Sequence, residues 1–126
     1  MTLSDARQLL ACEVFSGEEF LDRTVLYGCA SDLMSDVLAF SRSGSLLLTG
    51  LVNVQTVQTA YIAEINAIIF VRGKRPEKAV VGIAQEKGIP LLGTPYSMYE
   101  ACAILYRAGI PPSMNGVADH ASTKNP

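Results

Sequence analysis

Several residue types and motifs that mark catalytic or nucleic-acid-binding proteins are scarce in this sequence. Its one histidine, His120, lies near the C-terminus, so no histidine-based catalytic centre is expected. Charged residues make up 17% of the 126 residues and the net charge is −2, which leaves no basic surface for nucleic acid. Neither a G-x-x-x-x-G-K-[ST] P-loop nor a G-x-G-x-x-G loop occurs, so the recognisable devices for holding nucleotide phosphates are missing.

Cysteines and long apolar runs are also few. The three cysteines, Cys12, Cys29 and Cys102, are odd in number, far apart and set among apolar residues. This pattern predicts buried thiols in a reducing compartment, and no metal-ligand spacing or cofactor motif accompanies them. No uncharged apolar run reaches the roughly 18 residues of a membrane span, and Asp5 and Arg7 interrupt the N-terminus where a signal peptide would lie. We therefore expect a cytoplasmic protein with no membrane partner.

The sequence is long enough, and apolar enough, for a single domain with its own core. Apolar residues make up 49% of the chain, which is high for a small monomer and favours a hydrophobic subunit interface. We expect a homodimer or a larger homo-oligomer. Residues 1–110 are predicted to form the domain, and 111–126, with two prolines followed by mostly polar residues, a flexible tail.

Three short apolar runs organise the chain, at residues 45–48, 67–71 and 90–92. Each has the pattern of a strand buried on both faces, and each leads through a glycine-containing loop into a segment with helical periodicity. Alternating strands and helices predict an α/β fold: a single-domain, three-layer structure whose mostly parallel sheet is flanked by helices. The further elements predicted are strands at 12–15 and 24–29 and helices at 4–11, 33–40, 53–65, 77–87 and 95–108.

The three loops should meet at the carboxyl edge of the sheet, where open α/β sheets bind ligands. In the first loop Thr49 and Gly50 lead to Asn53, the natural N-cap of the next helix. Free backbone N–H groups and the dipole of that helix can attract an anion. The simpler interpretation is a tight turn between strand and helix.

The loop before this one contributes acidic residues. Ser31 or Asp32 is expected to cap the helix at 33–40, and Asp36 follows four residues after Asp32 on the same face. Two carboxylates so placed can bind a cation or share a proton. The alternative, which we favour, is a helix cap with a solvated acid beside it.

The second and third loops add cations and a tyrosine. Arg72, Lys74 and Arg75 flank Gly73 at a strand end, where Arg72 can form a fork on a carboxylate or phosphate. Two simpler interpretations are given equal weight with this ligand-binding role. The loop is solvated, or Arg72 pairs with an acidic residue across a subunit interface. In the third loop Thr94 is the expected N-cap of the last helix. Two residues that follow it, Tyr96 and Ser97, either line a cleft or serve packing.

These motifs resemble the DRTGG domain family. The resemblance lies in Leu-Leu-Leu-Thr-Gly at 46–50, Ala-Ile-Ile-Phe-Val-Arg-Gly-Lys-Arg-Pro at 67–76 and Gly-Ile-Pro-Leu-Leu-Gly-Thr-Pro-Tyr-Ser at 88–97, and extends over roughly residues 25–110. The small stand-alone members are often labelled HPr serine kinase-like. The resemblance implies an α/β module that accompanies HPr kinase-like proteins, phosphate acetyltransferases and CBS-containing pyrophosphatases, and that regulates or oligomerises without catalysis of its own.

The chain departs from the family at its name-giving Asp-Arg pair. That pair should follow the central strand, near residues 51–53, where this sequence has Leu-Val-Asn. The Asp22-Arg23-Thr24 triplet lies before the preceding strand, and we take it as coincidence. The first hypothesis is a non-enzymatic regulatory or ligand-sensing module that self-associates and binds a small anionic metabolite or nucleotide. The alternatives are an adaptor that docks onto a partner enzyme, and an enzyme acting on a phosphorylated small molecule through Asp32 or Asp36 with Arg72 and Lys74.

Overall fold

The structure, a computed structural model, describes residues 1–114. Five helices and five strands alternate along most of this length, with a short 3₁₀ turn after the first strand. In chain order they are α1 Leu3–Leu9, β1 Glu13–Ser16, the 3₁₀ turn Glu18–Phe20, β2 Tyr27–Ala30, α2 Met34–Phe40, β3 Ser45–Thr49, α3 Val54–Ile62, β4 Ala67–Phe70, α4 Lys78–Lys87, β5 Leu91–Gly93 and α5 Met98–Arg107.

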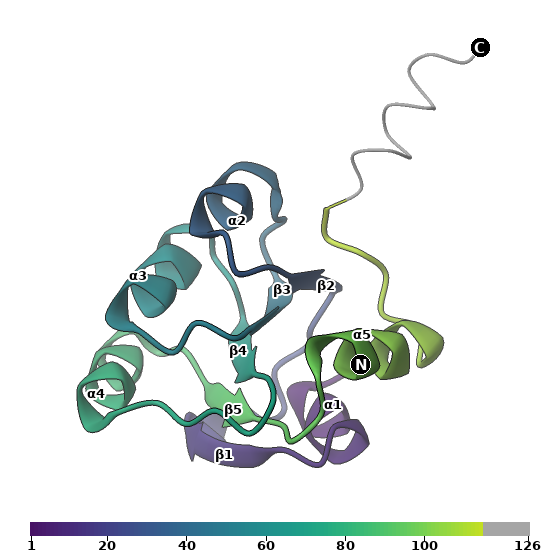
Figure 1. The fold of residues 1–126 in the computed structure, drawn as a ribbon, viewed down its shortest axis with the longest axis horizontal. Coiled ribbons are helices and arrows are strands. Elements are labelled where there is room, and N and C mark those ends of the chain that lie inside the picture. Colours follow the sequence, from purple (N-terminus) through teal and green to yellow (C-terminus); the bar gives the residue numbers. More distant parts are fainter. Residues whose placement is uncertain (115–126) are drawn as a thin grey trace.

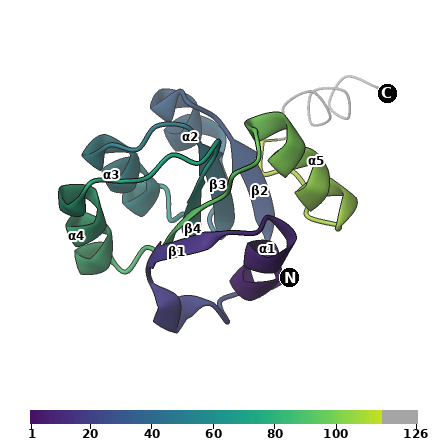
Figure 2. The same ribbon diagram turned by 60° about the horizontal axis from the view of Figure 1, so that its bottom comes forward.

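The strands form one sheet in the order β1-β5-β4-β3-β2. Strands β2 to β5 are parallel, and β1 joins the outer side of β5 in the antiparallel direction. Each crossover moves the chain one strand further in the same direction, so α2, α3 and α4 lie on one face of the sheet. The other face carries α1 and α5 (Figures 1 and 2). The predicted three-layer α/β fold with a mostly parallel sheet is confirmed.

Each face of the sheet has its own core, and β3 divides its side chains between them. Leu46 and Leu48 pack with α1 and α5, whereas Leu47 packs with α2, α3 and α4. All three leucines are at most 2% exposed. Successive side chains of a strand point to opposite faces, so an unbroken apolar run is what a strand covered on both sides requires.

Helix caps agree with the sequence at some positions and differ at others. Asn53 caps α3 by accepting a hydrogen bond from Thr56 N, and Gly88 ends α4 in the left-handed region, both as predicted. Two predicted caps are wrong. Helix α2 begins at Met34 without a side-chain cap from the preceding residues, and α5 is capped by Ser97 rather than by Thr94.

The segment after α5 does not leave the domain at residue 110. Gly28 N donates to Pro111 O, and Ser113 N donates to Gly28 O, so the segment runs along the outer side of β2. Ser113 is 1% exposed, and its hydroxyl accepts from Arg42 N and Ser45 Oγ. Residues 111–114 therefore belong to the packed structure, whereas the rest of the predicted tail, with His120, lies outside the described residues. Among residues 1–114 no helix has the length and apolar character that crossing a membrane requires.

Candidate functional site

The carboxyl ends of the four parallel strands bring together the loops after β2, β3, β4 and β5. Asp32 links the first two of them. Its Oδ1 accepts a hydrogen bond of 2.7 Å from Gly50 N and another of 2.9 Å from Thr49 Oγ1. The backbone bond from Gly50, together with the Thr49 hydroxyl and the nearby charges of Lys74 and Arg72, holds the pKa of Asp32 below its usual value in spite of some burial. Asp32 is thus an ionised bridge between loops and not a helix cap.

Lys74 approaches the same glycine from the loop after β4. Its Nζ donates to Gly50 O at 2.8 Å. A Cβ built on Gly50 would lie 3.5 Å from Lys74 Nζ and 3.6 Å from both carboxylate oxygens of Asp32. These are ordinary van der Waals distances, so a cation and an anion both lie next to the backbone of Gly50. The Gly50 N–H, which was expected to be free for an anion, is already used by Asp32.

The loop after β4 is held in an unusual conformation. Arg72 has φ 59° and Gly73 has φ 70°, so two successive residues lie in the left-handed region. Arg72 N donates to Tyr96 O and Gly73 N to Thr94 O, both at 2.8 Å, which ties this loop to the one after β5. An arginine in this region is strained, whereas glycine is not. The Arg72 side chain is exposed and makes no hydrogen bond to any residue of the described part.

The remaining predicted site residues serve the loops themselves. Ser31 Oγ accepts from Leu33 N, and Thr94 Oγ1 donates to Leu10 O at 2.6 Å. Ser97 and Glu100 form a capping box on α5. Tyr96 contributes its carbonyl and half-buried packing. Asp36 makes no side-chain hydrogen bond within residues 1–114, so it takes no part in the bridge that Asp32 forms, and the same part holds no cluster of three metal-ligating side chains.

Strand β1 adds residues that the sequence did not reveal. Glu13 binds Arg75 through both carboxylate oxygens, at 2.5 and 2.8 Å. Arg75 also lies over the ring of Phe15, 5.0 Å from its centroid. These side chains line a cavity of about 170 Å³ with Lys74, Gly73 and Gly93. The basic cluster was visible in the sequence, but nothing there placed β1 beside β5.

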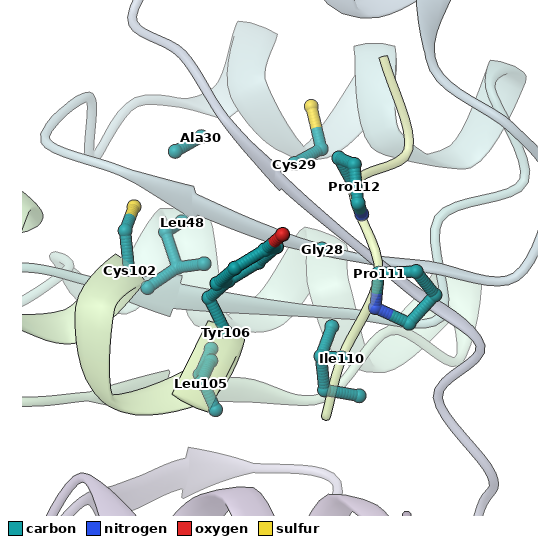
Figure 3. Close-up of a pocket in the computed structure, with 10 residues that line it drawn as sticks. All are labelled: Gly28, Cys29, Ala30, Leu48, Cys102, Leu105, Tyr106, Ile110, Pro111 and Pro112. Atoms are coloured by element: carbon teal, nitrogen blue, oxygen red, sulfur yellow. The ribbon is translucent and has the colours of Figure 1, made fainter. Parts of the chain in front are cut away.

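Two other hollows lie away from these loops. An apolar pocket of about 110 Å³ lies between α5 and β2, where Tyr106 and the prolines 111 and 112 lie on either side of Gly28 (Figure 3). A wider groove of about 660 Å³ lies at the amino edge of the sheet. There Arg23 donates to Asn66 O and Gly88 O, so it connects the loops at the edge opposite the candidate site.

Comparisons with known proteins agree on the family and the fold. The DRTGG domain model matches residues 6–108. Among solved structures, the CBS and DRTGG domains of the regulatory region of Clostridium perfringens pyrophosphatase, complexed with its activator diadenosine tetraphosphate, superpose with a TM-score of 0.70 at 17% identity. The similarity covers 90% of this chain and 50% of that one, so the chain spans half of the neighbour's length. No curated protein matches at a significant level.

Proposed function

The chain belongs to the DRTGG domain family, and from this premise we propose that it is a non-catalytic regulatory module of the cytoplasm. In this proposal the module senses a small anionic metabolite or a nucleotide at the carboxyl edge of its sheet, and it self-associates. The regulatory region of the pyrophosphatase that shares the fold was crystallised with a nucleotide activator, which supports an anionic ligand of this class here.

The observation that carries the proposal is the state of Arg72. Its guanidinium is exposed, has no partner among the described residues, and sits on a backbone that stores strain. Strained residues concentrate at ligand sites, where surrounding contacts hold them in place. Lys74 lies on the same loop, and the neighbouring acid, Asp32, is already engaged by two hydrogen bonds. An incoming phosphate or carboxylate therefore meets a fork of donors with a second cation beside it.

Catalysis at this edge is disfavoured by the same contacts. Asp32 is the carboxylate beside Lys74 and Arg72, and its lowered pKa makes it a weak base. The buried thiols are also poor nucleophiles, because burial raises the pKa of Cys12 to about 12 and that of Cys29 to about 11.

Self-association is supported by apolar side chains on the surface of α2 and next to it. Leu33, Leu38 and Phe40 are 57%, 48% and 62% exposed. Large apolar side chains that are exposed to this degree favour burial against another protein surface. A second copy is the partner we propose, and a partner enzyme docking on the same surface is the alternative.

Isothermal titration calorimetry with ATP tests the ligand proposal. We expect binding by the wild-type protein and a 10- to 100-fold weaker affinity for Arg72→Ala, since a charge-assisted hydrogen bond contributes about 1.5–3 kcal/mol. The matched control is Arg107→Ala, because Arg107 is an exposed arginine at the far end of α5. Equal affinities in all three proteins would place the ATP site elsewhere.

A further inference from the structure

The cavity at the outer end of the carboxyl edge contains an arginine fork that already holds a carboxylate. Its walls come from β1, from β5 and from the loop after β4, and its lining residues include the ion pair of Glu13 and Arg75. Glu13 occupies both donors of the Arg75 fork. A carboxylate and a phosphate present the same pair of oxygens to such a fork, so Glu13 stands where an oxyanion of a ligand would bind.

Arg75 is positioned by more than its partner acid. Its guanidinium rests over the Phe15 ring, and that ring lies against the backbone of Gly93. A Cβ at position 93 would come within 2.7 Å of Phe15 Cε2, so the aromatic platform depends on the glycine. The cation–π contact with the Phe15 ring does not depend on Glu13. The Arg75 guanidinium therefore keeps its orientation when Glu13 is displaced.

The ion pair between Glu13 and Arg75 is suited to exchange. Its two side chains are 52% and 64% exposed, and ion pairs exposed to this degree contribute little to stability. Lys74 also lines the cavity, whereas its Nζ donates to Gly50 O, and Gly50 is not among the lining residues. The volume of about 170 Å³ is below the roughly 300–1,000 Å³ of pockets for drug-sized ligands. The cavity therefore fits one compact oxyanion group and not a whole dinucleotide.

We propose that this cavity binds the terminal phosphate group of a phosphorylated metabolite on Arg75, and that Glu13 acts as a built-in competitor which the ligand displaces. The inference rests on the proposed function, because it concerns an anion site at the same edge of the sheet. It adds that a side chain of the protein competes with the ligand for this site. Glu13 then sets the ligand concentration at which the module responds, since binding must first open its bond with Arg75.

The test is calorimetry with inorganic pyrophosphate as the probe. Glu13→Gln removes the competing charge and should tighten binding at least threefold. Arg75→Ala should weaken it at least tenfold, and Arg75→Lys, which keeps the charge without the fork, should fall between that variant and the wild type. Glu18→Gln is the matched control: it changes net charge equally from an exposed site, and it should leave the affinity unchanged.

A purely structural ion pair predicts the opposite pattern. If Glu13→Gln binds pyrophosphate no more tightly than the wild type, or if Arg75→Ala retains its affinity, the competitor role is overturned, even where ATP binding still depends on Arg72. If neither ATP nor pyrophosphate binds the wild type or Glu13→Gln, both this inference and the proposed anion site fail. Thermal unfolding of each variant confirms that it is folded before the affinities are compared.

Discussion

Asp32 connects two loops that are far apart in the sequence. Its carboxylate receives one backbone and one hydroxyl hydrogen bond from the loop after β3, and these bonds fix the glycine whose carbonyl accepts from Lys74. One side chain thus determines how the acidic and basic loops of the edge meet. The expected role of Asp32 was a local cap on α2. Its carboxylate instead accepts from Thr49 and Gly50, and hydrogen bonds of this kind favour the charged form of the carboxylate.

Asp32→Asn should therefore lower the free energy of unfolding at neutral pH by about 1 kcal/mol, a value reduced for solvent exposure of the group. The pKa of Asp32 is lower in the folded protein than the usual pKa of an aspartate, so its contribution to stability is fully present above that usual pKa and is lost as pH falls through the folded pKa. Urea unfolding of both proteins at pH 7 and at about pH 3 should show the difference shrinking in acid.

The control for this series is Asp36→Asn. Asp36 lies on α2 and makes no side-chain hydrogen bond within the described residues, so its substitution should change stability little at either pH. A deficit for Asp32→Asn that is the same at both pH values would mean that the charge of Asp32 is not what joins the loops.

At the scale of elements, the sequence predicts what local rules decide. The strands predicted at 45–48, 67–71 and 90–92 are found at 45–49, 67–70 and 91–93. Their parallel pairing and the Asn53 cap also follow from burial patterns and turn residues. The sequence fails where a distant partner takes over a side chain. Threonine is a suitable residue type for a helix cap, but the Thr94 hydroxyl donates to Leu10 O instead. Leu10 is far away in the sequence, so local sequence patterns could not predict this contact. The cap of α5 moves to Ser97, three residues later.

Ser97→Ala should accordingly cost about 1 kcal/mol of stability, because it removes the oxygen that accepts from Glu100 N and one half of the capping box. Chemical denaturation measures the loss. Ser35→Ala, on the exposed side of α2 and without a capping role, is the control and should not destabilise the protein. A Ser97→Ala protein as stable as the wild type would show that tertiary contacts alone define the start of α5.

At the scale of the molecule, the two outer layers differ in what they leave exposed. The layer of α2 and α3 exposes Leu33, Leu38, Phe40, Tyr61 and Ile62, whereas the layer of α1 and α5 exposes Leu9, Tyr99 and Tyr106. The composition alone predicted an apolar interface, but only the layer arrangement shows which helix has apolar side chains to bury. The sequence predicts that the loops after the parallel strands meet at one edge, whereas the place of Glu13 and Phe15 beside them required the position of β1.

Light scattering at micromolar concentration should give the mass of a dimer or a larger assembly. Phe40→Asp places a charge among the exposed residues of α2 and should shift the mass toward that of the 13.5 kDa chain. Tyr99→Asp, at an 85% exposed position on the opposite layer, should leave the mass unchanged. A clean monomer mass for the wild-type protein would contradict self-association.

The central claim is that an anion binds at the carboxyl edge without being chemically changed. Titration of isotope-labelled protein with ATP, followed by amide resonances and by the phosphorus spectrum of the same sample, tests both parts at once. The account predicts shifts at Gly50, at residues 72–75 and at Glu13, with the phosphorus signals of ATP persisting unhydrolysed. Shifts confined to the amino-edge groove around Arg23 and Lys87, or the appearance of ADP and phosphate signals that depend on the protein, would contradict it.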